Sequence, residues 1–187
     1  MSECVFCKPE EILKKRIIHT DSDGWYAFVP DEPEIFGHII VTVKQPHIRE
    51  IISEDDKTLE TLQCMTKGVK YIADILRKIK NVQRVYFAML GETEDVHMHY
   101  HVFPRYGFVR DYEIDDWAKE YHLSKGFIAW QRFYSQPTVG FTSLDGFQYL
   151  GEIEKAYTIK KREIGSKPSN SLVEEMVEKI INMIALS

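Results

Sequence analysis

The sequence predicts an α+β fold in which one long helix covers an antiparallel sheet of about five strands. Two observations lead to this prediction. Apolar residues recur every three or four positions over residues 53–80, which is the period of one amphipathic helix. Short runs rich in β-branched and aromatic residues lie on both sides of that segment, and such runs, separated by turn residues, favour strands.

The composition is typical of a soluble globular protein. The chain has 187 residues, of which 44% are hydrophobic and 28% charged, and this length suits one domain, or one domain with an appendage. The net charge of −5 argues against an extended nucleic-acid surface. No apolar run is long enough to span a membrane, and the N-terminus lacks the layout of a signal peptide. We therefore expect a cytoplasmic protein whose three cysteines are reduced.

The elements before the histidine-rich region are predicted from turn residues, β-branched content and helical periodicity. They are a short helix over 8–14, strands over 16–19, 25–29 and 38–43, a helix capped by Ser53 and ending near residue 80, and a strand over 82–90. The apolar face of the long helix consists of Leu59, Leu62, Met65, Val69, Ile72, Leu76 and Ile79. We interpret Cys64 in this helix as a core or boundary residue without a site role.

Three histidines alternate with apolar residues in the next segment, His97-Met98-His99-Tyr100-His101-Val102-Phe103-Pro104. Successive side chains of a strand point to opposite faces, so the segment predicts a strand with three histidines on one face. Met98, Tyr100 and Val102 would then form the core face. Histidines in such a row suit three chemistries, which the pattern alone leaves open: metal ligation, nucleophilic attack at phosphorus by a neutral imidazole, and a pH switch.

The last part of the chain has a different character. Residues 108–150 are dense in aromatic residues, to which we assign no fold and which we expect to cover an edge of the sheet. A final helix capped by Ser171 is predicted from its apolar face, which must be buried against the body or against a second copy. That face consists of Leu172, Val173, Met176, Val177, Ile180, Ile181 and Ile184.

Three blocks of the sequence resemble the histidine triad (HIT) superfamily. The triad segment with Pro104-Arg105 behind it is similar to the family motif, and Gly37-His38, an apolar strand and Lys44-x-x-His47 resemble the upstream block. Cys4-x-x-Cys7 resembles the start of many microbial members. The resemblance covers roughly residues 3–106, so it implies a HIT domain over 1–106 and an unassigned extension over 107–187 that packs on the domain or the dimer.

The resemblance implies a nucleotidyl hydrolase or transferase that acts at the α-phosphorus of a nucleotide. His99 would be the nucleophile, His101 would contact the phosphate oxygens, and His38 would support the triad from the neighbouring strand. Members with the N-terminal cysteine pair often bind a structural zinc ion, and members often form homodimers that join their sheets. The zinc ligands implied here are Cys4, Cys7, His47 and His97.

The chain differs from the family at two places that bind substrate in family members, the ribose-binding position and the loop before the triad. Pro30 occupies the family's ribose-binding position, which leaves the adjacent Asp31 as the substitute. The loop before the triad is short and acidic, and Thr93 is its only hydroxyl. The three carboxylates of residues 92–95 would repel a phosphate beside them unless they point to solvent, which is the expectation here, or bind a divalent cation. These departures keep open a nucleotide-binding or scaffold protein with little catalysis. A second alternative is a metalloenzyme whose three histidines all hold a catalytic metal.

Overall fold

The computed structural model describes residues 4, 6–33, 36–45, 47–48, 56–79, 82–89, 97–106 and 170–186. Three of our sequence predictions fall outside these residues: the cap at Ser53, the acidic loop that contains Thr93, and the structure of residues 107–169. The proposed domain boundary after residue 106 therefore stays a prediction. Within the described part of the chain, no helix is both long enough and apolar enough to span a bilayer.

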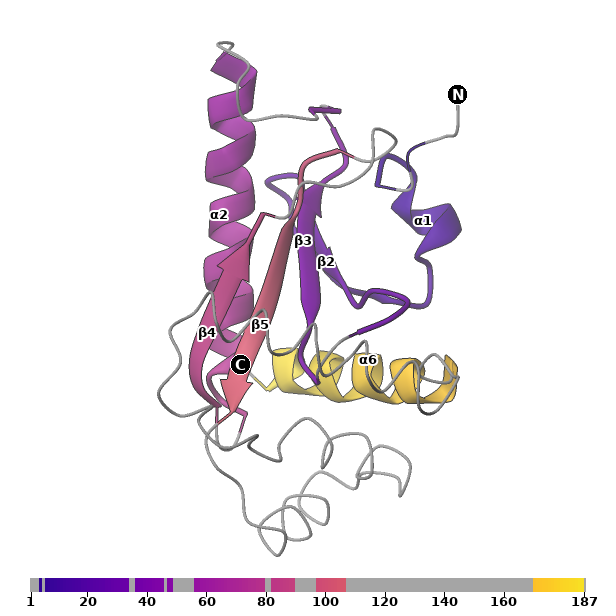
Figure 1. Ribbon diagram of the computed structural model, residues 1–187. Helices are drawn as coiled ribbons and strands as arrows, with labels where there is room; N and C mark the ends of the chain where they lie inside the picture. Colours follow the sequence, from indigo (N-terminus) through magenta and orange to yellow (C-terminus); the bar gives the residue numbers. More distant parts are fainter. Residues whose placement is uncertain are drawn as a thin grey trace, which may run out of the picture.

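The described elements form one antiparallel sheet with helices on both sides (Figure 1). The strands are β1 (Ile17–Thr20), β2 (Trp25–Phe28), β3 (Ile39–Val43), β4 (Val82–Ala88) and β5 (Tyr100–Tyr106), in the order β1-β2-β3-β5-β4. The helices are α1 (Pro9–Ile12), α2 (Asp56–Leu76) and α6 (Asn170–Ala185). In Figure 1, α2 lies on one side of the sheet and α1 on the other. The predicted α+β class with five strands and one long helix is confirmed.

Helix α2 crosses the sheet at close range because it carries a glycine at the crossing point. A Cβ added at Gly68 would lie 2.7 Å from side-chain atoms of both Trp25 on β2 and Val41 on β3. The predicted apolar face of the helix is buried from Met65 onward, and Ile79 is buried just beyond its end. The prediction is wrong for Leu59, which is 59% exposed, because the buried positions in the first turns of α2 are Thr58 and Thr61.

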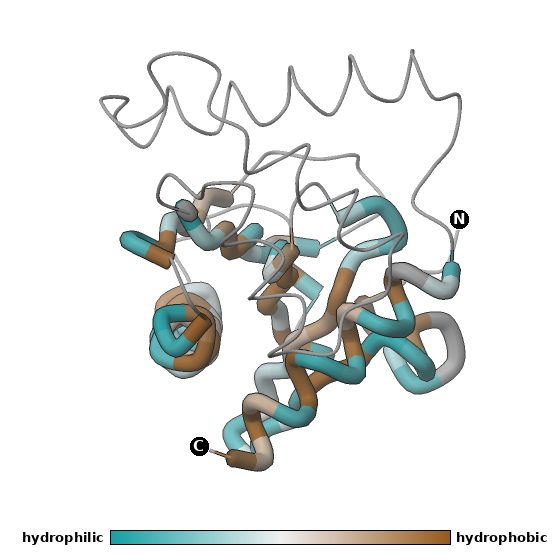
Figure 2. Tube along the Cα trace, turned by 90° about the horizontal axis from the view of Figure 1, so that it is seen from below, coloured by the Kyte–Doolittle hydropathy of each residue, from teal (hydrophilic) through white to brown (hydrophobic). Residues whose placement is uncertain are grey.

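Helix α6 belongs to the same hydrophobic core as α2. Val173, Met176, Val177 and Ile180 are buried in the cluster that also contains Ile18 of β1. Apolar and polar residues alternate along the helix, as expected for an amphipathic element (Figure 2). The final helix therefore covers the body of its own chain, although Ile181, which we expected on the buried face, is 40% exposed.

Strand β5 begins later than the alternating pattern predicts. Tyr100 is its first residue, so His97 and His99 precede the strand. The reason lies at Met98, whose amide donates to the carbonyl of Ile48 at 2.8 Å and whose carbonyl accepts from the Thr42 hydroxyl at 2.9 Å. These bonds replace the ladder with β3. Met98 and Val102 nevertheless lie in the core, and Tyr100 packs against it, as the alternation predicts.

Candidate functional site

Three histidines form a chain of contacts on the face of the sheet opposite α2. His101 lies in register with Ile40 of β3, so its side chain is on the Ile40 face. Its Nε2 is 3.0 Å from Nε2 of His99, and its Nδ1 is 2.9 Å from Nε2 of His38. The His38 ring also stacks on Phe103 with centroids 4.3 Å apart. All three rings are buried, so their contacts are made in a medium where hydrogen bonds are strong.

One backbone carbonyl fixes the tautomers of all three rings. Nδ1 of His99 lies 3.0 Å from the carbonyl oxygen of His97, which can only accept, so Nδ1 carries the hydrogen. In the neutral ring, Nε2 of His99 is then an acceptor, and the N–H that donates to it belongs to Nε2 of His101. Nδ1 of His101 is in turn the acceptor for the Nε2–H of His38. In this arrangement the Nε2 lone pair of His99 accepts the hydrogen of His101, and an unprotonated imidazole nitrogen of this kind can ligate a metal or attack phosphorus.

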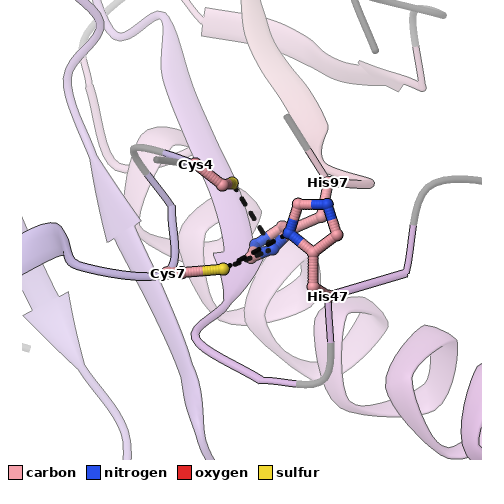
Figure 3. Close-up of side chains that lie close together, drawn as sticks. All are labelled: Cys4, Cys7, His47 and His97. Carbon is pink, nitrogen blue, oxygen red and sulfur yellow. Dashed lines mark hydrogen bonds between the residues drawn. The ribbon is translucent and has the colours of Figure 1, made fainter. Parts of the chain in front are cut away.

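Four potential metal ligands, Cys4, Cys7, His47 and His97, lie close together in a second cluster (Figure 3). Cys4 and Cys7 come from the N-terminal turn, His47 follows β3, and His97 precedes β5. Their ligand atoms all lie within 4.8 Å of one another. Cys64, by contrast, lies in α2 and donates to the carbonyl of Asp23, so it is not part of the cluster.

The spacing of these atoms suits a tetrahedral zinc ion. Zn–S bonds of about 2.3 Å and Zn–N bonds of about 2.05 Å at the tetrahedral angle place sulfur and nitrogen about 3.6 Å apart. Sγ of Cys7 lies 3.3 Å from Nδ1 of His47 and 3.6 Å from Nδ1 of His97. Sγ of Cys4 lies 3.9 Å from Nδ1 of His97. Two sulfurs and two imidazole nitrogens are also a donor set that zinc prefers, so the residues fit this metal.

Burial shifts the pKa values of two cluster members in opposite directions. It lowers the pKa of His97 to about 4, and the neighbouring His47 acts in the same direction. Burial raises the pKa of the Cys7 thiol to about 11, and the contact with Cys4 adds to that shift. His97 is therefore already in the neutral state that ligates metal at pH 7, whereas Cys7 must lose a proton when metal binds.

Sequence reasoning missed Phe6, which lies between the two clusters. Its ring meets that of His99 edge-on, with centroids 4.9 Å apart and planes at 67°, and it contacts the His97 ring at 5.4 Å. The signal was present in the sequence, because Phe6 is one of the two residues enclosed by Cys4-x-x-Cys7. Its importance was not visible there, since the partner His99 is 93 positions away.

Of the two predicted substrate-binding residues, the structure describes Asp31, which contacts Arg16. Asp31 forms an ion pair with Arg16 at 2.6 Å and lines a cavity of about 300 Å³. The other lining residues, none of which belongs to the triad, are Lys14, Lys15, Arg16, Asn170, Val173 and Glu174. Thr93 lies outside the described residues. The roles of both residues in substrate binding stay predictions.

Comparisons with known proteins agree with this geometry. No family model matches the chain. An uncharacterized HIT-like protein of Methanocaldococcus jannaschii is 27% identical over 131 residues, which cover 63% of this chain and 97% of the relative. A crystal structure of a HIT-like protein involved in cell-cycle regulation from Bartonella henselae has a TM-score of 0.51 at 16% identity, and the alignment covers 93% of this chain and 92% of that one.

A second structure, of a HIT family protein from Bacillus anthracis, has a TM-score of 0.47 at 18% identity and covers 64% of this chain and 94% of that one. The likeness to the Bartonella protein shows the fold. The Methanocaldococcus relative shares sequence as well, over nearly its whole length. The chain therefore has a HIT-like fold, and its sequence is similar to that of a HIT-like protein over nearly the whole length of that relative.

Proposed function

We propose that this protein is a nucleotidyl hydrolase or transferase that acts at the α-phosphorus of a nucleotide through a nucleotidyl intermediate on His99. The substrate class is a nucleotide whose α-phosphate carries a leaving group, such as a dinucleoside polyphosphate or a nucleoside phosphoramidate. The observation that carries the proposal is the hydrogen bond from Nδ1 of His99 to the carbonyl of His97, because it directs the lone pair of Nε2 towards His101. Attack at phosphorus requires such an unprotonated nitrogen.

In the proposed first step, Nε2 of His99 forms a bond to phosphorus while the bond from phosphorus to the leaving group breaks. The leaving atom takes the bonding electron pair and a proton from solvent, which the second step returns. The Nδ1–H of His99 stays bonded to the carbonyl of His97, which stabilises the positive charge that develops on the ring. In this step the Nε2–H of His101 exchanges Nε2 of His99 for a non-bridging phosphate oxygen as its acceptor.

In the second step, water attacks the same phosphorus and the phosphorus–nitrogen bond breaks. The electron pair of that bond returns to Nε2 of His99, a proton of the water is released, and the nucleoside monophosphate leaves. His38 donates to Nδ1 of His101 throughout and so holds the His101 ring with its Nε2–H towards the phosphate position. His38 is therefore proposed as a supporting residue and His101 as the phosphate-binding residue.

The test is to trap the intermediate. The protein is mixed with a dinucleoside polyphosphate, quenched within the first turnover, digested and analysed by mass spectrometry for a nucleotide adduct. We expect one adduct, on the peptide that contains His99, and none in His99→Ala. A variant that lacks His99 and still turns the substrate over at the parent rate would exclude His99 as nucleophile. His19→Ala is the matched control, because the His19 ring packs against Trp25 and Tyr71 rather than in the row of His38, His99 and His101.

One observation favours the second candidate, a nucleotide-binding protein with little catalysis. The His99 ring is only 2% exposed, and its Nε2 already accepts a hydrogen bond from His101. Substrate must therefore displace that bond before phosphorus can approach. Tight nucleotide binding by calorimetry, together with no adduct and no turnover across a panel of dinucleotides and phosphoramidates, would support this function over the enzymatic one.

The proposed cofactor is a structural zinc ion held by Cys4, Cys7, His47 and His97. A zinc ion with four protein ligands has no open position for substrate, so it would crosslink the N-terminal turn to the segments around β3 and β5. This assignment leaves His99 outside the metal site. It also opposes the metalloenzyme alternative, because His97 cannot serve in a catalytic set with His99 and His101 while it faces the two thiols.

Metal content separates these assignments. We expect one zinc per chain by elemental analysis in the parent and in Cys64→Ser, and none in a variant with both Cys4→Ser and Cys7→Ser. Cys64 is the matched control because it is the remaining cysteine and lies outside the cluster. Zinc retained in the double variant would favour the three histidines of the triad as its ligands.

The proposed partner, besides the nucleotide, is a second copy of the chain. Strand β4 is an edge of the described sheet, and Phe87 on that strand is 55% exposed while its ring meets Tyr100 at 5.6 Å. Pairing of β4 with β4 of a second copy would cover this ring and give hydrogen-bond partners to the backbone groups at the edge of the sheet. Light scattering after gel filtration should give twice the chain mass for the parent and the single mass for Phe87→Arg. An unchanged dimer in Phe87→Arg would place the interface elsewhere.

A further inference from the structure

We infer that Phe6 is a positioning residue for His99, and that through Phe6 the Cys4-x-x-Cys7 turn controls the orientation of the nucleophile. This inference rests on the proposed function for its effect on turnover, but its effect on the His99 ring can be measured without any substrate. It differs from a purely structural role of the turn, in which the N-terminus would be anchored and the reacting ring would be unaffected.

The contacts of Phe6 carry the inference. Its ring meets the rings of His97 at 5.4 Å, His99 at 4.9 Å and Phe28 at 5.6 Å, and only 5% of Phe6 is exposed. The edge-on arrangement against His99 is one that aromatic rings prefer. The carbonyl of His97 fixes one end of the His99 ring through Nδ1, and His101 contacts the other end through Nε2. Phe6 adds lateral support, which limits rotation of the ring about the axis that these two bonds define.

The backbone of Phe6 is held as firmly as its side chain. The hydroxyl of Tyr26, a fully buried residue of β2, donates to the carbonyl oxygen of Phe6 at 2.9 Å. The amide of Cys7 donates to the carbonyl of Cys4 at 3.1 Å and closes the turn around Phe6. Burial raises the pKa of the Tyr26 hydroxyl far above its usual range, so this hydroxyl remains a donor. Tyr26 therefore anchors the turn to the sheet, and the turn holds Phe6 against His99.

The same turn supplies two of the four residues that fit zinc. Its geometry is therefore set by the ligand positions at Cys4 and Cys7, which flank Phe6 on both sides. Any change that opens the turn must move the Phe6 ring, because only one residue separates it from Cys4 and none from Cys7. The arrangement joins the metal site to the nucleophile through one phenyl ring, in addition to the direct backbone link from His97 to His99.

The experiment compares Phe6→Ala and Phe6→Leu with Phe28→Leu in the zinc-loaded protein, with zinc content measured in each preparation. Phe28 is the matched control because it is equally buried in the same cluster, and its described ring contacts are with Phe6 and Tyr26. The first readout is the ¹⁵N signature of the His99 ring at fixed pH, which distinguishes a hydrogen on Nδ1 from one on Nε2. The second is the separation of kcat from KM for a dinucleoside polyphosphate.

We expect Phe28→Leu to retain the parent ¹⁵N signature and a kcat within about threefold, because the reacting geometry is kept. Phe6→Ala should show a mixed tautomer signature at His99 and lose about 10- to 100-fold in kcat with KM little changed, since small misplacement of a reacting group costs that much. Phe6→Leu, which keeps most of the volume and is the safer variant for folding, should lie between the two. Tyr26→Phe, which keeps the ring and removes one hydrogen bond, should shift the signature in the same direction as Phe6→Leu.

An unchanged His99 signature in both Phe6 variants, with zinc bound, would overturn the inference whatever the kinetics show. A changed signature in Phe28→Leu of equal size would also overturn it, because the effect would then belong to the cluster as a whole. If the parent has no turnover on any substrate, the proposed function fails, and the ¹⁵N comparison still decides the role of Phe6.

Discussion

Protonation of His97 should by itself lower the free energy of unfolding of the metal-free protein as the pH falls. Burial lowers the pKa of His97 to about 4 in the folded chain, whereas an unfolded chain gives it a value of about 6.5. Between these two values the unfolded chain binds one more proton than the folded chain. The stability contributed by neutral His97 is therefore fully present above pH 6.5 and is lost as the pH falls towards 4.

The size of the effect follows from the two pKa values. Applying the linkage relation to this single site gives a loss of about 2 kcal/mol in the free energy of unfolding between pH 7 and pH 5, and about 3 kcal/mol by pH 4. A loss of about 2 kcal/mol is large beside the roughly 5–15 kcal/mol by which native proteins are stable. Bound zinc would add to the pH dependence, because protons compete with the metal for His97.

The assay is urea unfolding at pH 7 and pH 5 in the presence of a chelator, for the parent and for His97→Gln. Glutamine cannot titrate, so the difference between the two acid-induced losses isolates His97 from all the carboxylates that protonate in the same range. We expect the parent to lose about 2 kcal/mol more than His97→Gln. An equal loss in both proteins, or a directly observed NMR titration of His97 centred near 6.5, would refute the reasoning.

Three further outcomes are expected. Zinc added to the metal-free protein at pH 7 should release at least one proton per ion, because the pKa of Cys7 is raised to about 11. A pH indicator in weakly buffered solution measures the release, and no release would mean that Cys7 is not a ligand. Gly68→Ala should lower the free energy of unfolding by about 1–2 kcal/mol in urea titrations, since overpacking against Trp25 and Val41 costs more than the gain in helix propensity. A stabilised variant would mean that α2 shifts away from the sheet at little cost. Thr42→Val should cost about 1–3 kcal/mol by the same measurement because the carbonyl of Met98 loses its donor, and an unchanged stability would mean that water replaces the hydroxyl.

Residue spacing was enough to predict the fold class and the long helix. An apolar period of three to four residues can be satisfied only by a helix that buries one side, and the β-branched runs around it can pair only as strands. The same local rules failed at the ends of elements. Leu59 fits the apolar period but is exposed, because Thr58 and Thr61 take the buried positions in that part of α2. The alternation around the triad gives no sign that β5 starts only at Tyr100.

The four potential zinc ligands were predicted through resemblance, and the tertiary structure brings them together. The reason that the sequence alone could not do so is distance along the chain. Cys7, His47 and His97 are separated by 40 and 50 positions, and only the order of strands in the sheet determines that their segments meet. The same holds for Asp31, whose ion pair with Arg16 depends on how the loop after β2 lies against the start of β1.

By itself, then, the sequence determined which elements form and which residue types carry the chemistry, because local periodicity and side-chain chemistry are properties of neighbouring residues. The tertiary structure decided which nitrogen of His99 carries its hydrogen, which ring supports it, and that Phe6 lies between the thiols and the triad. Those features depend on contacts between segments that are far apart in the chain, and such contacts exist only once the sheet and its two hydrophobic clusters have assembled.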